Sequence, residues 1–509
     1  MQNRIRKQSG FAVLLISLLI TACRKDLGNY DYQAINQCEI LNIGEEYTVL
    51  RGGALEIIPQ LSFTQDKTGN KDNYSYKWMV ASAQAIVLSE QPALHEVINL
   101  PAQTEAYTAY YVVTEKSTGV MWRKQFRIRV STNIADGWLV LSEVNNKARL
   151  DYLNYVNSGQ PYQLYTDILS QQSGPVLDGH PQFVSFYYRI DAFSNVRGKS
   201  VVVGTDKSTY IINTQANTFT SYMNLPDAMS VYYPAPYYAK TVKPIYASRS
   251  YMYDNLGQLT YEYPTVGTAY GRVVNRTITG EKINISPIYA EGIQSSLYVL
   301  MYDVVNKRFV QHKEGDDVSS VPVPLAGPEP PKFDPGNMGM DLLYMCATNA
   351  VSQQTYAVLK NPAGKVFLAR IQCNESVFLP LAFDDITTYA PMMAQATQFA
   401  IEHSQGYLMY VVGSKLYRYN PYDHSNEMVL DMGSRVISLI KFQRLVYMYQ
   451  TQRYMDETSR LVVASYDPAS PDNSGTMDLY TVPSLNNPLV KYMSYSGFGK
   501  IADVSYREN

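Results

Sequence analysis

Short segments in which apolar and polar residues alternate, or in which β-branched and aromatic residues cluster, recur along almost the whole chain. This is the two-residue period of half-buried strands, and turn-forming residues separate the segments. Six segments fall within residues 37–132, which is the density of an immunoglobulin-like β-sandwich. They occupy residues 47–50, 55–58, 61–63, 74–78, 109–114 and 126–130.

Aromatic residues mark the expected core of this sandwich. Tyr74, Tyr76 and Trp78 alternate with other residues, so a strand would point all three rings to one face. Trp78 is therefore predicted to fill the space between the two sheets, with Tyr110 and Tyr111 on a facing strand. No pair of cysteines flanks the tryptophan, which excludes an antibody-type domain.

A coarser repeat runs from residue 133 to the C-terminus. Strand–turn–strand units with Asn, Asp or Gly in their turns recur about every 54 residues, a period close to that of propeller blades. This predicts an all-β chain whose residues 133–509 form a β-propeller of about seven blades. Six or eight blades also fit, and two further sandwiches are the competing fold. The units begin near Trp138, Val201, Tyr246, Tyr298, Tyr356, Leu408 and Val462.

The composition supports this fold class and excludes one class of binding partner. Of 509 residues, 45 are tyrosine, which suits strands, and only 17% are charged, which excludes a disordered chain and a coiled coil. Helical periodicity is nearly absent. The net charge of −2 and the lack of a basic run exclude nucleic acid as a partner.

The N-terminus has the pattern of an export signal. Three basic residues within the first seven positions precede an apolar stretch at 11–20, which would span about 15 Å as a helix, half of a bilayer. We therefore predict a signal peptide over residues 1–22 rather than a membrane span.

Cys23 follows the small residues Thr21 and Ala22, an arrangement similar to the bacterial lipobox. This predicts that Cys23 is acylated and becomes the first residue of a lipid-anchored protein, with a polar tether over residues 23–36. The alternative is an ordinary secretory signal followed by an unrelated cysteine.

The other cysteines are Cys38, Cys346 and Cys373. Cys346 and Cys373 both lie in strand-like segments and are interpreted as buried thiols, although a cross-strand disulfide stays open. No Cys-x-x-Cys sequence occurs, and the five histidines are scattered beyond any local ligand spacing. We therefore expect no metal and no cofactor.

Several segments together resemble the PKD-like family of lipoproteins from Gram-negative anaerobes. The resemblance implies a PKD-type sandwich followed by a propeller-like region, anchored in the outer membrane and facing the cell surface. It also implies, as partners, a TonB-dependent outer-membrane transporter and its lipoprotein lid, and it brings no catalytic residues. The segments are residues 23–32, 47–52, 76–78, 136–143 and 497–506.

Sequence signatures of catalysis are missing. The chain has no Gly-x-Ser-x-Gly elbow, no Walker loop and no dinucleotide fingerprint. Residues 254–257 resemble a fragment of a calcium loop but are better explained as a hairpin turn. A propeller hydrolase in which Asp206 and Asp303 converge from separate blades is the weakest of the functional hypotheses.

Tyrosines supply the candidate binding site. A proline-containing stretch between two units carries four of them, and proline keeps such a loop extended and ready to present rings to a ligand. Further tyrosines at 187, 188, 251 and 253 are expected in neighbouring loops. The leading hypothesis is a non-catalytic binder of a glycan or peptide, and the alternative is a scaffold for the transporter complex. The candidate binding residues are Tyr232, Tyr233, Tyr237, Tyr238, Tyr251 and Tyr253.

Overall fold

The computed structural model describes most of the chain from residue 35 onward. The predicted signal peptide, Cys23 and nearly all of the tether lie outside the described residues. The description covers residues 35–509 except 69, 83, 101–104, 132–133, 135, 158, 191–196, 246–248, 263–269, 293–297, 314–318, 326–329, 349–353, 374–377, 445–446 and 449.

The first nine strands form the expected β-sandwich. One sheet has the order β2-β9-β8-β5-β6, with β2 parallel to β9, and two pairs, β1-β4 and β3-β7, complete it. The short helix η1 (Lys71–Asn73) precedes β5. The strands are β1 (Cys38–Leu41), β2 (Glu46–Leu50), β3 (Gly53–Ile57), β4 (Gln60–Phe63), β5 (Tyr74–Val80), β6 (Ile86–Ser89), β7 (Leu94–Ile98), β8 (Tyr107–Glu115) and β9 (Met121–Ser131).

Trp78 lies at the centre of the sandwich, as predicted. Its side chain is fully buried and its ring stacks on Tyr111 with centroids 4.1 Å apart. The expectation that Tyr111 lies on a facing strand is wrong, because β8 pairs with β5 in the same sheet and Tyr111 is directly opposite Trp78. The two rings share one face as a cross-strand pair, which is the geometry that alternation on adjacent strands produces.

The remaining strands form a β-propeller, confirming the predicted fold class. The described residues contain seven four-stranded antiparallel sheets. In the order given below, the first strand of each sheet is the innermost and the last is the outermost. They are β37 (Lys500–Arg507), β10 (Gly137–Val144), β11 (Lys147–Asn154), β12 (Gln163–Tyr165); β13 (Pro181–Ile190), β14 (Arg197–Thr205), β15 (Thr209–Asn213), β16 (Ser221–Asn224); β17 (Ala239–Ile245), β18 (Arg249–Asp254), β19 (Leu259–Glu262), β20 (Tyr270–Val273); β21 (Ala290–Glu291), β22 (Tyr298–Asp303), β23 (Arg308–Lys313), β24 (Val321–Pro322); β25 (Asp341–Ala347), β26 (Gln354–Lys360), β27 (Val366–Cys373), β28 (Phe378–Asp385); β29 (Gln398–Ile401), β30 (Leu408–Val412), β31 (Lys415–Tyr419), β32 (Asn426–Asp431); β33 (Val436–Phe442), β34 (Arg460–Tyr466), β35 (Gly475–Thr481) and β36 (Val490–Phe498).

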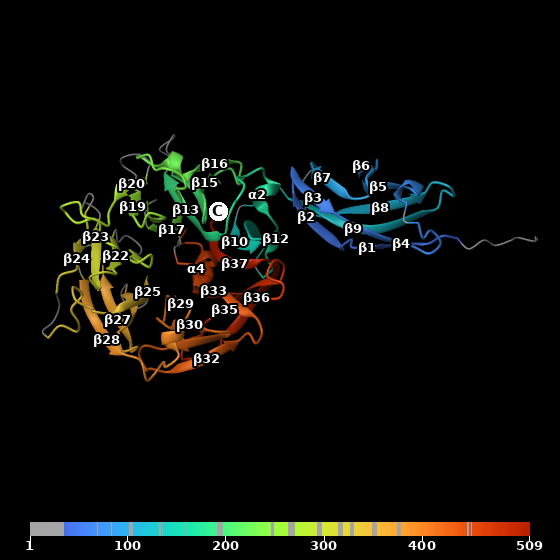
Figure 1. Ribbon diagram of the computed structural model, residues 1–509. Helices are drawn as coiled ribbons and strands as arrows, with labels where there is room; N and C mark the ends of the chain where they lie inside the picture. The colour runs from blue at the N-terminus through green and yellow to red at the C-terminus, as the bar shows by residue number, and fades with distance from the viewer. Residues whose placement is uncertain are drawn as a thin grey trace, which may run out of the picture. The chain divides into compact units, whose positions relative to one another are not determined.

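The sheets follow one another around a ring (Figure 1). The inner strands contact each other in the order β37, β13, β17, β21, β25, β29, β33 and back to β37, so the ring is closed. The two middle strands of each sheet are covered on both faces by the neighbouring sheets, and β22, for example, is buried at every position. This explains why these hairpins have nearly continuous apolar sequences.

The first sheet is built from both ends of the propeller region. β37, the last strand of the chain, pairs with β10, the first strand of the propeller, and Trp138 lies opposite Tyr506. At this seam Gly499 leaves no room for a side chain, because a Cβ would meet the carbonyl oxygen of Glu143. Pairing of the two ends removes the free edges that an open ring would expose.

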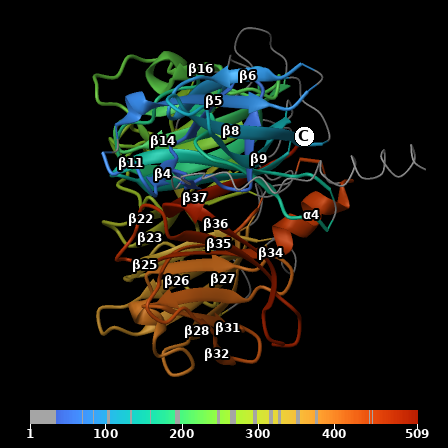
Figure 2. The same cartoon turned by 90° about the vertical axis from the view of Figure 1, so that its right-hand side faces the viewer.

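A short helix, which the sequence analysis did not predict, reinforces this seam. Helix α4 (Gln452–Ser459) connects β33 to β34, and its Tyr454 hydroxyl donates to the Asp136 carboxylate at 2.7 Å. Glu457 of the same helix accepts a 2.7 Å hydrogen bond from the Tyr162 hydroxyl. Figure 1 shows α4 toward the centre of the ring and Figure 2 shows it at one face. The helix therefore ties the last sheet to the first.

Other helical segments are short. They are α2 (Ile168–Gln171), η2 (Leu225–Ala228) and η3 (Met393–Gln395). Over the described part of the chain, no helix is long and apolar enough to cross a membrane.

Removal of the Arg507 guanidinium should weaken ring closure. Arg507 is fully buried on β37 and donates to the carbonyl oxygens of Ile134 and Thr214 and to Asn217 Oδ1. Arg507→Met removes all three hydrogen bonds from the buried seam, so we expect the free energy of unfolding to fall by about 3 kcal/mol. Urea unfolding followed by intrinsic fluorescence measures the change.

The matched control for this prediction is Lys500→Met, since Lys500 is exposed on the same strand. Its urea midpoint should stay close to that of the unchanged protein. Equal midpoints for the two variants would contradict the role given to Arg507.

Candidate functional site

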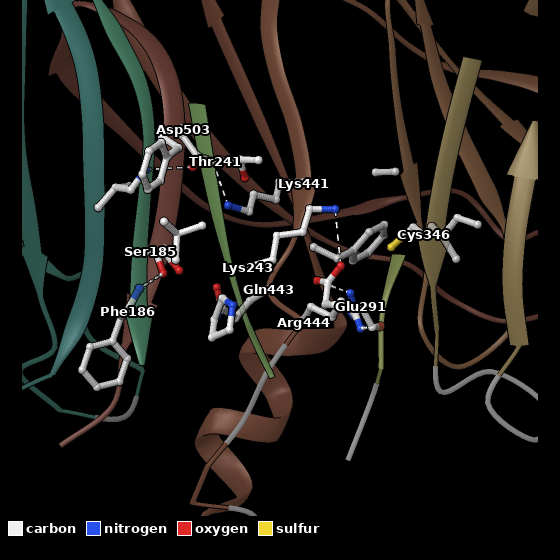
Figure 3. A pocket seen from close by; sticks show the side chains of 18 of the residues that line it. Ser185, Phe186, Thr241, Lys243, Glu291, Cys346, Lys441, Gln443, Arg444 and Asp503 are labelled. Atoms are coloured by element: carbon white, nitrogen blue, oxygen red, sulfur yellow. Dashed lines mark hydrogen bonds and ion pairs between the residues drawn. The ribbon is translucent and has the colours of Figure 1, made fainter. Parts of the chain in front are cut away.

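The seven inner strands enclose a cavity of about 240 Å³ at the axis of the propeller (Figure 3). Every sheet contributes at least one lining residue, because alternate side chains of each inner strand point to the axis. Polar and charged groups therefore meet there although they are far apart in the sequence. The lining residues that carry charge are Lys243, Glu291, Lys441, Arg444 and Asp503.

Glu291 forms an ion pair that crosses the axis. It lies at the end of β21 and pairs with the guanidinium of Arg444, which follows β33 on the opposite side of the ring. Lys243 of the adjacent β17 lies 3.4 Å from the same carboxylate. Burial opposes ionisation of Glu291, but Arg444 and Lys243 outweigh it and lower its pKa.

A second ion pair lies farther along the cavity wall. The Lys441 amine of β33 lies 2.7 Å from the Asp503 carboxylate of β37. Asp503 also accepts a 3.0 Å hydrogen bond from the backbone N–H of Val184 on β13. Asp503 thereby connects three consecutive inner strands, and both of its oxygens have partners.

The charges that line the cavity do not balance. Three cations, Lys243, Lys441 and Arg444, face two carboxylates, those of Glu291 and Asp503. His403 adds no charge near neutral pH, because burial and the nearby Arg444 lower its pKa to about 3. The lining thus carries one excess positive charge.

Exposure to solvent changes along the cavity. The side chains of Lys441 and Lys243 are 33% and 28% exposed, whereas those of Arg444 and Glu291 are 16% and 8% exposed. In Figure 3 the helix α4 lies below Arg444, at the more buried end. The two lysines are therefore the most exposed charged side chains of the lining, whereas Asp503, which pairs with Lys441, is 14% exposed.

Part of the wall is aromatic. The rings of Tyr344 on β25 and Phe399 on β29 stack with centroids 5.4 Å apart, and both residues line the cavity. Cys346 lies beside them as a free thiol, and Cys373 is a buried free thiol on β27. The two cysteines are not joined, because β26 separates their strands.

The loop with four tyrosines is anchored to the hairpin turn between β18 and β19. Tyr233 and Tyr237 stack at 4.3 Å with an angle of 6° between their planes. The Tyr237 hydroxyl donates to Asp254 at 3.1 Å, and burial of Asp254 raises its pKa. Asn255 donates to the carbonyl oxygen of Pro236 at 2.9 Å.

The four tyrosines of this loop differ strongly in exposure. Tyr232 is 87% exposed, Tyr233 and Tyr238 are half-buried, and Tyr237 is buried. Tyr232 is therefore the ring that the loop offers to solvent, beside the stacked pair that supports it.

The other predicted tyrosines are not in loops, which corrects the sequence-based expectation. Tyr251 and Tyr253 lie on the middle strand β18 and are 0% and 8% exposed. Tyr187 is fully buried on β13, and Tyr188 is half-buried on the same strand. Neighbouring sheets cover these strands, so the rings belong to the core between blades rather than to a binding surface.

Sequence analysis missed the charged residues of the axis. Glu291 and Arg444 are 153 residues apart and neither belongs to a recognisable motif. One local signal was available, since the segment 239–245 carries Lys240 and Lys243, which a strand would point to opposite faces. A charge within such a segment indicates either an edge strand or a polar cavity.

Asp206 and Asp303 of the hydrolase hypothesis both accept hydrogen bonds from backbone N–H groups. Asp206 accepts a 2.8 Å hydrogen bond from the backbone N–H of His180. Asp303, which is buried, accepts from the backbone N–H groups of Val305 and Asn306 at 3.1 Å. Within the described residues no group of three or more His, Cys, Asp or Glu could hold a metal ion.

Comparison with known proteins gives one family match. The model of the PKD-like family matches residues 23–181, which include the sandwich and strands β10 to β12 of the propeller. No curated protein matches the chain. This region is therefore similar to PKD-like proteins, in agreement with the resemblance noted in the sequence.

Several solved structures are similar over most of the chain at low identity. A quinoprotein alcohol dehydrogenase-like protein from Bacteroides thetaiotaomicron has 13% identity and a TM-score of 0.41, with 91% of this chain and 94% of that chain covered. The extracellular domain of a putative one-component system from the same species has 10% identity and a TM-score of 0.40, with 91% of this chain and 70% of that chain covered. AztD from Citrobacter koseri has 10% identity and a TM-score of 0.32, with 86% of this chain and 98% of that chain covered. No activity is transferred from them.

Loss of the Glu291 charge should destabilise the propeller. Glu291→Gln leaves the half-buried Arg444 and Lys243 without a carboxylate, and we expect the free energy of unfolding to fall by about 3 kcal/mol near pH 7. The control Asp385→Asn removes an exposed pair with Lys365 and should lower it by less than about 1 kcal/mol. Urea denaturation of both variants checks the difference.

The difference in stability between the wild type and Glu291→Gln should also depend on pH in a defined direction. The pKa of Glu291 is lower in the folded protein than its ordinary value, so its stabilising effect is complete above about pH 4.3 and is lost as the pH falls through the lowered value. Denaturation of wild type and Glu291→Gln between pH 3 and pH 8 should give curves that converge only in acid. Convergence between pH 6 and pH 8 would contradict the ion-pair account.

Proposed function

We propose that this protein is a non-catalytic binding protein of the bacterial cell surface. It is held in the outer membrane by lipid on Cys23 and retains a polymeric nutrient, a glycan or a peptide, for a TonB-dependent transporter and its lipoprotein lid. The lipobox-like sequence and the PKD-like match support the anchored location. The tyrosine loop between β16 and β17 is the proposed contact with the polymer.

The observation that carries this proposal is the fixed, outward-facing arrangement of Tyr232. The stack of Tyr233 on Tyr237 and the hydrogen bond from Tyr237 to Asp254 hold the loop before any ligand arrives. Tyr232 then offers most of its ring to solvent. A preformed loop loses little conformational entropy on binding, so more of the contact energy contributes to affinity.

The chemistry of an exposed tyrosine suits extended polymers. Its ring packs against the C–H face of a sugar or against an apolar peptide side chain, while its hydroxyl donates or accepts a hydrogen bond. A long polymer can also contact several copies of a membrane-bound protein at once. Weak contacts at each copy then combine into firm retention.

A protein partner is the second candidate for the same surface. Val231 is 53% exposed next to Tyr232, and Leu256 in the adjoining hairpin turn is 44% exposed. Apolar residues that gather on a surface often mark a protein interface. On this alternative the loop docks the transporter or its lid, and the protein acts as a scaffold.

Tyr232→Ala tests the binding role directly. Removal of the exposed ring should weaken retention of the bound polymer about tenfold, the effect of losing about 1.4 kcal/mol of contact energy. The control Tyr389→Ala removes a ring that is 48% exposed in the connection between β28 and β29, and it should leave retention unchanged. Affinity electrophoresis in polysaccharide gels and binding to peptide digests measure the effect.

Three outcomes separate the candidates. A tenfold loss for Tyr232→Ala alone supports the binder. Unchanged polymer binding together with loss of co-purification with the transporter in mild detergent supports the scaffold. Equal polymer retention and equal co-purification for Tyr232→Ala and Tyr389→Ala would exclude the loop from both roles.

A further inference from the structure

We propose that the axial cavity of the propeller binds a small organic carboxylate. Such a ligand would place its carboxylate near Lys243 and Arg444 and its carbon body against Tyr344 and Phe399. This site lies on the inner strands, and the inference does not depend on the function assigned to the tyrosine loop.

The first reason is the excess charge. The lining has three cations and two carboxylates, and Arg444 and Lys243 share the single carboxylate of Glu291. An excess charge on side chains that are mostly removed from water is costly. Arg444 cannot relieve it by losing a proton, since its pKa is raised, with Glu291 outweighing the effect of burial. A bound anion restores neutrality without changing the protonation of any lining group.

The second reason is a pair of buried ring and guanidinium nitrogens beside these cations. The Nε atom of Arg444 and the Nε2 atom of His403 are buried and meet no hydrogen-bond partner within the described part of the chain. Both residues line the cavity, and the charge of Arg444 acts on His403. The His403 Nδ1 atom lies 3.4 Å from the Thr348 hydroxyl, which leaves Nε2 as a further polar contact for a ligand.

The third reason is the size and the surface of the cavity. A cavity of about 240 Å³ has room for a small metabolite and not for a folded chain. The stacked rings of Tyr344 and Phe399 give one side of the cavity an apolar surface. A charged end beside an apolar wall favours an organic anion over an inorganic one.

Access to the site follows from the exposure of its walls. Lys441 and Lys243 are the more exposed of the charged side chains, whereas Glu291 and Arg444 are the more buried. An anion entering past Lys441 would therefore meet increasingly buried cations. This gradient draws negative ligands toward the less exposed Arg444.

The test measures binding to the full chain in detergent by isothermal titration. Glucuronate, galacturonate and succinate are the organic carboxylates, glucose is the uncharged counterpart of glucuronate, and inorganic phosphate is the inorganic anion. We expect at least one of the three carboxylates to bind with a Kd at least tenfold lower than that of glucose or phosphate. Binding should weaken in high salt.

Two variants change the charge of the site in opposite directions. Lys243→Met leaves two cations and two carboxylates and should weaken carboxylate binding at least tenfold. Glu291→Gln raises the excess to two cations and should tighten it. The matched control is Lys240→Met, on the same strand but with an exposed side chain, and it should bind as the unchanged protein does.

The result that overturns the proposal is equally specific. It fails if none of the three carboxylates binds more tightly than glucose, if phosphate binds as tightly as they do, or if Lys243→Met and Lys240→Met bind equally. Thermal unfolding of Lys243→Met checks that the propeller of the variant is folded. A loss of binding in the folded variant can then be assigned to the lost charge.

Discussion

The pairing of the last strand with the first strand of the propeller is the constraint on which the rest of the structure depends. β37 joins β10 at the seam, and the first sheet therefore has its fourth strand only when the end of the chain has returned to the beginning of the propeller. Each inner strand then has a neighbour on both sides. Arg507 and the contacts of helix α4 with Asp136 hold this seam from within the molecule. Because closure is a contact between residues more than 350 positions apart, it depends on the cooperative assembly of all sheets.

Closure also creates the chemistry of the axis. The seven inner strands surround the propeller axis and bring together side chains that are far apart in the sequence. Glu291 meets Arg444 only in the closed ring. The pair contributes to the stability of the closed state and at the same time leaves one cation in excess. The axis therefore contains charged side chains that are mostly shielded from solvent. The tyrosine loop, in contrast, presents an exposed aromatic ring. The two features differ in size, exposure and chemistry, and they suit ligands of different kinds.

The sequence predicted the parts of the fold whose signal is local. The hairpin of β14 and β15 was recognised because its strands contain the short apolar runs 201–203 and 210–212, which pack between neighbouring sheets. The inner strand β17 was missed because it alternates between the core and the polar axis and contains Lys243 and Pro244. Tyr251 was misplaced in a loop because tyrosine serves this chain both as a core residue and as a surface residue. The ion pairs of the axis had no local signature, since only closure of the ring brings their members together.

Amide hydrogen exchange at the seam tests the central claim, that the ring is closed by the two ends of the propeller, most directly. Val140 of β10 lies opposite Val504 of β37, and both are fully buried. The account predicts that the amides of these two residues exchange only when the whole propeller unfolds, with protection equal to that of the middle strand β22. Exchange at the seam as fast as in the exposed outer strand β32 would contradict it, because it would mean that the ring opens without unfolding.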